Sequence, residues 1–260
     1  MINKHLKLFP YLFQLIFLTS TIGGIGYILA KYLLKVTNEN LILLIFIGFE
    51  FLGVAIFACM NRRITIICLN YLKLRKKQLE LFLKNFLFIS LAFSFISIIS
   101  YQLGIIRIQD IIEINYFNIL LYFSLALAVA ICEEILFRGF IALYINLIIN
   151  KKAALFVSSL LFASSHVQYN SIFPFVTAML AGVIFALLTF KYRSLLPAIG
   201  FHLGWNFSYF LFDDVFLVEL EMKVWGELFE VPQIILLSFV LVYLIYYIRY
   251  NHMKFKPLRR

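Results

Sequence analysis

The stretch 116–149 reads YFNILLYFSLALAVAICEEILFRGFIALYINLII and contains three charged residues, Glu133, Glu134 and Arg138, in an otherwise mainly apolar run. A bilayer core about 30 Å thick is crossed by about 20 apolar helical residues. The stretch is therefore predicted to be a membrane-spanning helix. Because it is longer than one straight crossing needs, we expect it to bend or to extend past the bilayer.

The composition of the whole chain supports a membrane location. Apolar residues make up 63% of the 260 residues and charged residues 14%, whereas soluble domains have about 45–50% and about 25%. A soluble fold of this size cannot bury so much apolar surface, so a soluble enzyme and a disordered protein are excluded. The odd number of cysteines, without a Cys-x-x-Cys pair, argues against a disulfide scaffold. The predicted fold class is all-α, a polytopic transmembrane helix bundle that forms one integral membrane domain over residues 1–260.

Hydropathy predicts about eight spans. The segment 61–80 between the second and third is basic and amphipathic, and it is either an interfacial helix or a plain loop. The predicted spans are 9–34, 41–60, 82–106, 116–149, 153–170, 173–190, 194–212 and 232–250.

The loop charges predict the orientation. With eight spans, 18 of the 23 Lys and Arg fall on one side, four fall on the other, and Arg138 lies inside a span. Cytoplasmic loops carry the excess of Lys and Arg, so both termini are predicted to be cytoplasmic. The formal net charge of +10 is thereby assigned to loops, and no nucleic-acid partner is expected. The Ile-, Asn-, Lys- and Phe-rich usage is typical of an AT-rich bacterial genome, which favours a bacterial plasma membrane.

Polar residues within the spans are few, and each costs about 2.5–3.5 kcal/mol on insertion scales if charged. They are therefore expected to be functional or paired inside the bundle. Glu134 and Arg138 are four residues apart and share one helix face, so they are predicted to form an ion pair. Glu133 is offset by about 100° and can point elsewhere in the bundle. The full set is Glu50, Glu133, Glu134, Arg138, His166, His202 and Asn206.

Three of the spans each present polar groups that could meet at one centre. A carboxylate such as Glu133 and an imidazole such as His166 can hold a water and take its proton. His202 and Asn206 share a helix face at i and i+4 and can donate hydrogen bonds to an oxyanion. Together these groups would make an acyl hydrolase without a covalent nucleophile, although a buried structural network is the alternative.

Other nucleophiles are less favoured by the sequence. Ser164 and Ser165 lie near His166, but small residues in membrane helices more often serve packing. Cys132 adjoins Glu133, yet on a helix it faces about 100° away. Glu50 is interpreted as lying near an interface and snorkelling to water, with a place in the cavity as the alternative.

Three motifs in this order resemble those of the CPBP family, the CAAX-protease and bacteriocin-processing intramembrane endopeptidases also called the abortive-infection family. The resemblance covers roughly 120–210, the expected catalytic core. The motifs are Glu133-Glu134-x-x-x-Arg138, Phe162-x-x-x-His166 and His202-x-x-x-Asn206.

The resemblance implies a glutamate-dependent, metal-independent peptidase with an eight-helix core and no cofactor. It assigns Glu133 as the general base and His166 as the residue that orients the water. His202 and Asn206 would stabilise the oxyanion. Glu134 and Arg138 would be the supporting ion pair, and Phe162 would pack or line the cavity. The substrate would be a peptide or a membrane-associated protein.

Three alternatives stay open. His166, His202 and Glu133 form an acceptable zinc-ligand set, although His-Glu-x-x-His is missing. Buried carboxylates and histidines also occur in the proton relays of transporters. Finally, the polar residues could serve a non-catalytic bacteriocin-immunity or regulatory membrane protein.

Overall fold

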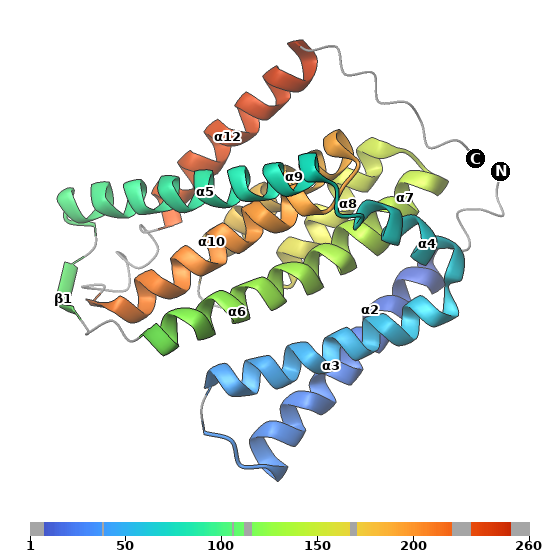
Figure 1. Ribbon diagram of the computed structural model, residues 1–260, viewed down its shortest axis with the longest axis horizontal. Coiled ribbons are helices and arrows are strands. Elements are labelled where there is room, and N and C mark those ends of the chain that lie inside the picture. The colour runs from blue at the N-terminus through green and yellow to red at the C-terminus, as the bar shows by residue number, and fades with distance from the viewer. Residues whose placement is uncertain are drawn as a thin grey trace.

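The computed structural model describes residues 8–37, 39–105, 107–111, 116–166, 171–219 and 230–250. The described chain is a bundle of helices with one two-stranded sheet at its end (Figure 1). In chain order the elements are α2 (Leu8–Ile28), the π-helix η1 (Leu29–Leu33), α3 (Glu39–Met60), α4 (Arg62–Tyr71), α5 (Lys76–Gln102), β1 (Arg107–Ile111), α6 (Tyr116–Glu133), the π-helix η2 (Glu134–Ala142), α7 (Leu143–Ile148), α8 (Lys151–Ser164), α9 (Phe173–Tyr192), α10 (Leu196–Val215), β2 (Phe216–Glu219) and α12 (Glu230–Tyr250).

Within the described ranges, six helical segments are long and apolar enough to cross a membrane. They coincide with six of the eight predicted spans, and the chain is a multi-pass membrane protein whose spanning part is helical, as predicted. Their bounds are Pro10–Leu33, Leu41–Met60, Lys76–Gln102, Tyr116–Ile148, Phe173–Tyr192 and Val231–Ile248.

The two remaining predicted spans, 153–170 and 194–212, correspond to α8 and α10. Helix α8 has only 14 residues, about 21 Å of helix, which is shorter than the bilayer core. Helix α10 has 20 residues but includes polar groups such as His202 and Asn206. It lies against α5, α6 and α9, and within the bundle His202 is buried and Asn206 half-buried. The count of eight crossings therefore stays a prediction.

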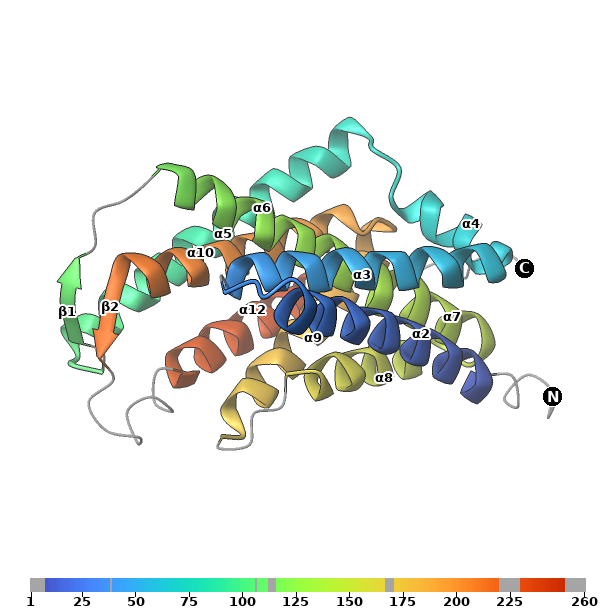
Figure 2. The ribbon, with the colours of Figure 1, turned by 90° about the horizontal axis from the view of Figure 1, so that it is seen from below.

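The sheet joins two connections that the loop charges place on the same side of the membrane. Strand β1 follows α5 and β2 follows α10, and the two pair antiparallel from Arg107 opposite Glu219 to Ile111 opposite Phe216. Figure 2 shows both strands together at one end of the bundle. Because α5 and α10 both lead directly toward this sheet, their C-terminal ends lie at the same end of the bundle.

Two glycines bring α10 into direct backbone contact with α5. A Cβ at Gly200 would overlap the Phe82 carbonyl oxygen, and one at Gly204 would come within 2.6 Å of the Phe86 carbonyl oxygen. Small residues four apart allow this close approach between membrane helices. His202 lies between the two glycines in sequence, about 200° around the helix from each, and therefore faces away from α5 toward the interior of the bundle.

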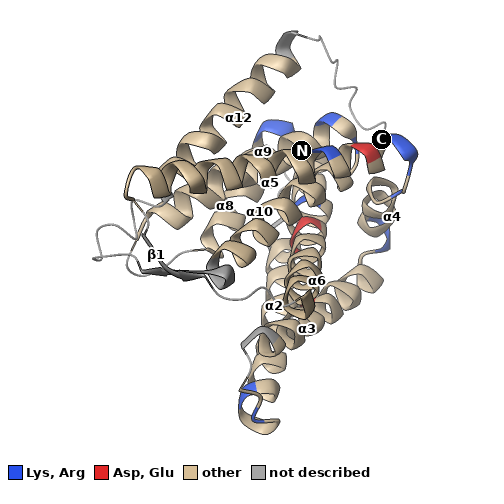
Figure 3. Cartoon of the chain, turned by 60° about the vertical axis from the view of Figure 1, so that its left-hand side comes forward, with Lys and Arg blue, Asp and Glu red and all other residues tan. Residues whose placement is uncertain are grey.

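Basic residues gather at one end of the bundle, around α4 and the neighbouring helix ends, with a smaller group at the connection between α2 and α3 (Figure 3). The larger group is on the side that the loop charges predict to be cytoplasmic. Cys59 lies near the α4 end of α3 and is exposed, whereas Cys68 and Cys132 are buried. Burial also raises the pKa of the Cys68 thiol to about 12, and a thiol is far less reactive than a thiolate.

Cys59 is expected to react with a membrane-impermeant maleimide only after cells are permeabilised, because the orientation predicted from the loop charges places it at the cytoplasmic surface. Gel-shift labelling of intact and permeabilised cells measures this. The matched control is Gln102→Cys in a Cys59→Ser chain. Gln102 is exposed at the C-terminal end of α5, the end farther from α4. This control should be labelled in intact cells. Labelling of Cys59 in intact cells would show that the predicted orientation is wrong.

Candidate active site

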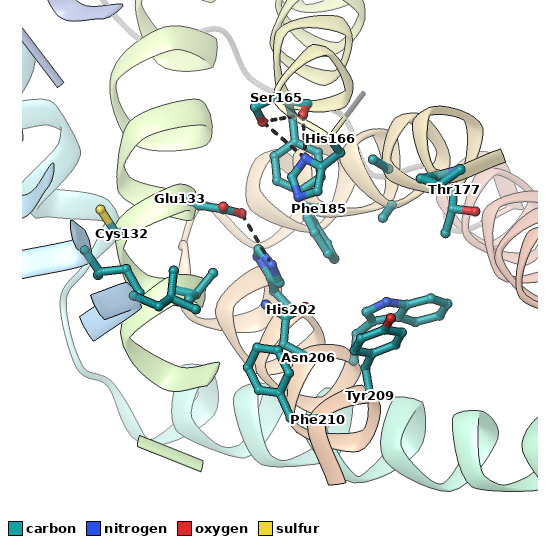
Figure 4. Close-up of a pocket in the computed structure, with 18 of the residues that line it drawn as sticks. Cys132, Glu133, Ser165, His166, Thr177, Phe185, His202, Asn206, Tyr209 and Phe210 are labelled. Carbon is teal, nitrogen blue, oxygen red and sulfur yellow. Dashed lines mark hydrogen bonds and ion pairs between the residues drawn. The ribbon is translucent and has the colours of Figure 1, made fainter. Parts of the chain in front are cut away.

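The three predicted motifs meet at one cavity of about 500 Å³. Its walls come from α3, α6, the end of α8, α9, α10 and the start of α12. Figure 4 shows Glu133, His166, His202 and Asn206 around this space. The polar residues that line it are Glu50, Cys132, Glu133, Ser165, His166, Thr177, His202, Asn206, Tyr209 and Gln233, together with the aromatic residues Phe46, Phe162, Phe185, Trp205 and Phe210.

The two adjacent carboxylates have different surroundings. Glu133 ends α6, lines the cavity and has a side chain 23% exposed. Glu134 begins the π-helix η2 and is fully buried. Single π-helical turns inside α-helices occur frequently at functional sites. The helix continues through α7 to Ile148, so the long predicted span is one helical segment that includes a nine-residue π-helix at the site.

The predicted ion pair is present and completely enclosed. Arg138 Nη1 donates to Glu134 Oε1 at 2.8 Å, and both side chains have 0% exposure. Arg138 Nη2 donates to the Gly182 carbonyl oxygen at 3.1 Å. The guanidinium carbon also lies 4.4 Å from the Phe162 ring centre and 4.9 Å from that of Phe185. These contacts compensate the cost of burying a charged group.

His202 extends this pair toward the cavity. Its Nδ1 lies 3.2 Å from Glu134 Oε1, and its Nε2 lies 3.5 Å from Glu133 Oε2. The ring stacks on Phe185 with centres 4.8 Å apart and planes at 17°. The contacts thus form one line of alternating donors and acceptors that ends at the cavity. In order, its members are Arg138, Glu134, His202 and Glu133. The contact between Glu134 and His202 joins residues 68 positions apart in the sequence. The helical spacing within each motif did not predict this contact, because the two residues belong to different motifs.

His166 lies just beyond α8, and its tautomer is set by the end of that helix. Its Nδ1 lies 2.8 Å from the Phe162 carbonyl oxygen, which is near the end of α8 and also accepts from the Ser165 backbone N–H at 3.2 Å. This contact requires the proton on Nδ1, so in the neutral ring Nε2 is the acceptor. The Ser165 hydroxyl donates to the same carbonyl at 2.7 Å. Ser165 Oγ also lies 3.2 Å from His166 Nδ1, but a protonated Nδ1 cannot take the proton of the hydroxyl. Ser164 Oγ donates to Leu160 O, so neither hydroxyl is arranged as a nucleophile with His166 as its base.

Three other residues considered in the sequence analysis line the cavity. Asn206 lines it one turn along α10 from His202, as the shared helix face predicted. Phe162 both packs on Arg138 and forms part of the wall. Cys132 reaches the wall as well, but its sulfur points away from His202 (Figure 4).

The position of Glu50 differs from the one that the sequence predicted. It was expected to snorkel near an interface, but it lies midway along α3 and lines the cavity. Gln233 of α12 was not singled out, although it also lines the cavity and is 2% exposed. The signal that could have found Gln233 is a polar amide in an apolar predicted span.

The part of the chain that the structure describes contains no preformed cluster of metal ligands. No group of three or more His, Cys, Asp or Glu side chains is placed there to hold an ion. His166, His202 and Glu133 share the cavity wall. However, His202 directs its two ring nitrogens at Glu134 and Glu133, and His166 directs Nδ1 at a backbone carbonyl.

Comparisons with known proteins bear on the segment that builds this site. No curated protein and no solved structure matches the chain. One family model, described as type II CAAX prenyl endopeptidase Rce1-like, matches residues 115–208. The matched segment contains all three motifs and every residue of the Arg138 to Glu133 line. Over residues 115–208 the chain therefore carries the sequence pattern of the Rce1-like CAAX prenyl endopeptidases, a family of proteases, as its three motifs predicted.

Proposed function

We propose that the chain is an intramembrane endopeptidase of the CAAX-protease type that hydrolyses a peptide bond with a water activated by Glu133. The observation that carries the proposal is the line from Arg138 through Glu134 and His202 to Glu133, which ends at a cavity of about 500 Å³. His166 and Asn206 line the same cavity. The family match over residues 115–208 supports the reaction class.

In the first step, Glu133 and His166 hold one water between them. His166 Nε2 accepts one hydrogen of the water because Nδ1 is committed to the Phe162 carbonyl. The Glu133 carboxylate accepts the other hydrogen as a proton, and the water oxygen bonds to the carbonyl carbon of the peptide. Water is then the nucleophile, and no acyl-enzyme forms.

In the second step, the oxyanion is stabilised by His202 and Asn206. Glu134 fixes the His202 ring through Nδ1, and Nε2 lies 3.5 Å from Glu133 Oε2, which is on the cavity wall. In its imidazolium form, His202 donates from both nitrogens, and the side-chain amide of Asn206 supplies a second donor. Removing one such donor costs about 10²–10³ in kcat in known hydrolases. Protonated Glu133 then returns its proton to the leaving nitrogen as the C–N bond breaks.

The substrate class follows from the location of the cavity. It lies among membrane helices and is lined by aromatic side chains, which suits a peptide or a membrane-associated protein in a bacterial plasma membrane. A pheromone, a bacteriocin-related peptide or a CAAX-like protein would fit this class. The deciding experiment compares membrane and secreted peptides from cells that produce the wild type or Glu133→Gln. A folded variant that leaves every peptide and the biological activity unchanged would favour a non-catalytic immunity or regulatory role.

Metal chelation is expected to leave peptide cleavage unchanged, because the proposed chemistry uses only protein side chains. The measurement is the cleavage rate of purified protein after dialysis against EDTA and, separately, against 1,10-phenanthroline. A zinc-dependent protease assayed in the same detergent is the positive control. Loss of cleavage that added zinc restores would replace this mechanism with a zinc site through His166, His202 and Glu133.

A further inference from the structure

Helix α3 lies outside the family-matched segment yet forms one wall of the cavity. Leu43, Phe46, Ile47 and Glu50 all line it, and their spacing of i, i+3, i+4 and i+7 places them on one helix face. The stripe presents three apolar side chains followed by one carboxylate. It therefore offers a substrate both apolar surface and a charge.

The Glu50 carboxylate has no protein partner in the ranges that the structure describes: no hydrogen bond or ion pair joins it to another side chain. It lies midway along a candidate membrane span, where an ionisable group is costly and by default functional. An arriving cation would compensate this cost. The same carboxylate at the bilayer surface would need no such ligand.

The cavity as a whole carries an excess of negative charge. Among the described residues that line it are the carboxylates Glu50 and Glu133, with no Lys or Arg. Arg138 is buried and already paired with Glu134, so it does not neutralise them. Charged clefts with low-dielectric walls concentrate ligands of opposite sign.

Gln233 adds a buried donor to the same cavity from α12. It is 2% exposed and lines the cavity, and its Nε2 finds no hydrogen-bond acceptor within the described residues. A buried amide donor without an acceptor costs free energy. A peptide main-chain carbonyl would satisfy it, so the cavity provides for both a cation and a peptide backbone.

We infer that Glu50 makes this cavity selective for peptides with a basic side chain, Lys or Arg, flanked by apolar residues. The apolar stripe of α3 would hold the flanking residues, and Gln233 would hold a main-chain carbonyl. The inference rests on the proposed peptidase function and assigns its specificity to residues outside the matched segment.

The test uses the full chain in detergent with quenched fluorescent decapeptides that are rich in Leu and Phe. In each set of peptides, one position is substituted with Lys, norleucine or Glu. The readout is the ratio of kcat/KM for the Lys peptide to kcat/KM for the norleucine peptide. The wild type should prefer Lys by about tenfold or more at one position, the size of a charged hydrogen bond. Glu50→Gln should bring the ratio near one, and Glu50→Lys should favour the Glu peptide.

Matched variants separate the possible outcomes. Glu80→Gln removes an exposed carboxylate of α5 and should keep the wild-type ratio, whereas Gln233→Leu should lower kcat/KM for all peptides and also keep it. An unchanged ratio in Glu50→Gln overturns the inference.

Glu133→Gln in the same assay tests the proposed function: if it still cleaves, or if the wild type cleaves no peptide, that function fails. Loss of cleavage in Glu133→Gln with no effect of Glu50 on the ratio refutes only the specificity.

Discussion

Replacing Glu133 with Gln is expected to lower kcat for peptide cleavage by about 10²–10⁴-fold, the usual contribution of a general base. Gln has nearly the same shape, so it can still contact His202, which lies 3.5 Å from Glu133 Oε2. It cannot accept the proton of the attacking water. Because the substrate contacts are retained, KM should change much less than kcat. Initial rates with purified protein in detergent or liposomes measure both constants.

The matched control for this change is Glu80→Gln, which makes the same chemical substitution on the exposed face of α5. It should retain the wild-type rate, and thermal unfolding should show that both variants are folded. Full activity of a folded Glu133→Gln variant would refute the assignment of Glu133 as the base. A rise in KM with kcat unchanged would instead make Glu133 a substrate-binding residue.

The contacts within one helix were predictable from the sequence. Glu134 and Arg138 are four residues apart, and a buried carboxylate and guanidinium at that spacing pair on any helical backbone close to α. The observed distance of 2.8 Å confirms this prediction. The spacing of His202 and Asn206 likewise placed both on one wall of the cavity. Local geometry fixes such pairs before any tertiary packing is known.

Contacts between helices were not predictable in the same way. The approach of His202 to Glu134 depends on how α10 sits against α6, and α10 is held from its other side by Gly200 and Gly204 against α5. The π-helix η2 (Glu134–Ala142) likewise has no simple sequence signal.

The position of Glu50 depended on a further inter-helix contact. The interpretation as a snorkelling residue failed because hydropathy gives depth in the membrane and not the direction in which a helix face points. Only the packing of α3 against α6 brings Glu50 to the cavity.

Replacing Arg138 with Met is expected to destabilise the fold by about 3–5 kcal/mol, the usual cost of breaking a buried ion pair by removing one partner. Met has a similar length and can fill the space between Phe162 and Phe185, so the cavity left behind is small. The Glu134 carboxylate, which has 0% exposure, then keeps only His202 as a partner. Reversible denaturation in mixed micelles, followed by tryptophan fluorescence, measures the free energy of unfolding.

A double-mutant cycle distinguishes the lost ion pair from lost packing. If the stranded charge dominates, Glu134→Gln combined with Arg138→Met should be more stable than Arg138→Met alone, since no uncompensated carboxylate remains. Arg62→Met, which removes an exposed guanidinium at the start of α4, should change stability by less than about 1 kcal/mol. A loss of less than about 1 kcal/mol in Arg138→Met would show that the pair contributes little to folding. The alignment of His202 by Glu134 would then have to come from the ring stacking on Phe185.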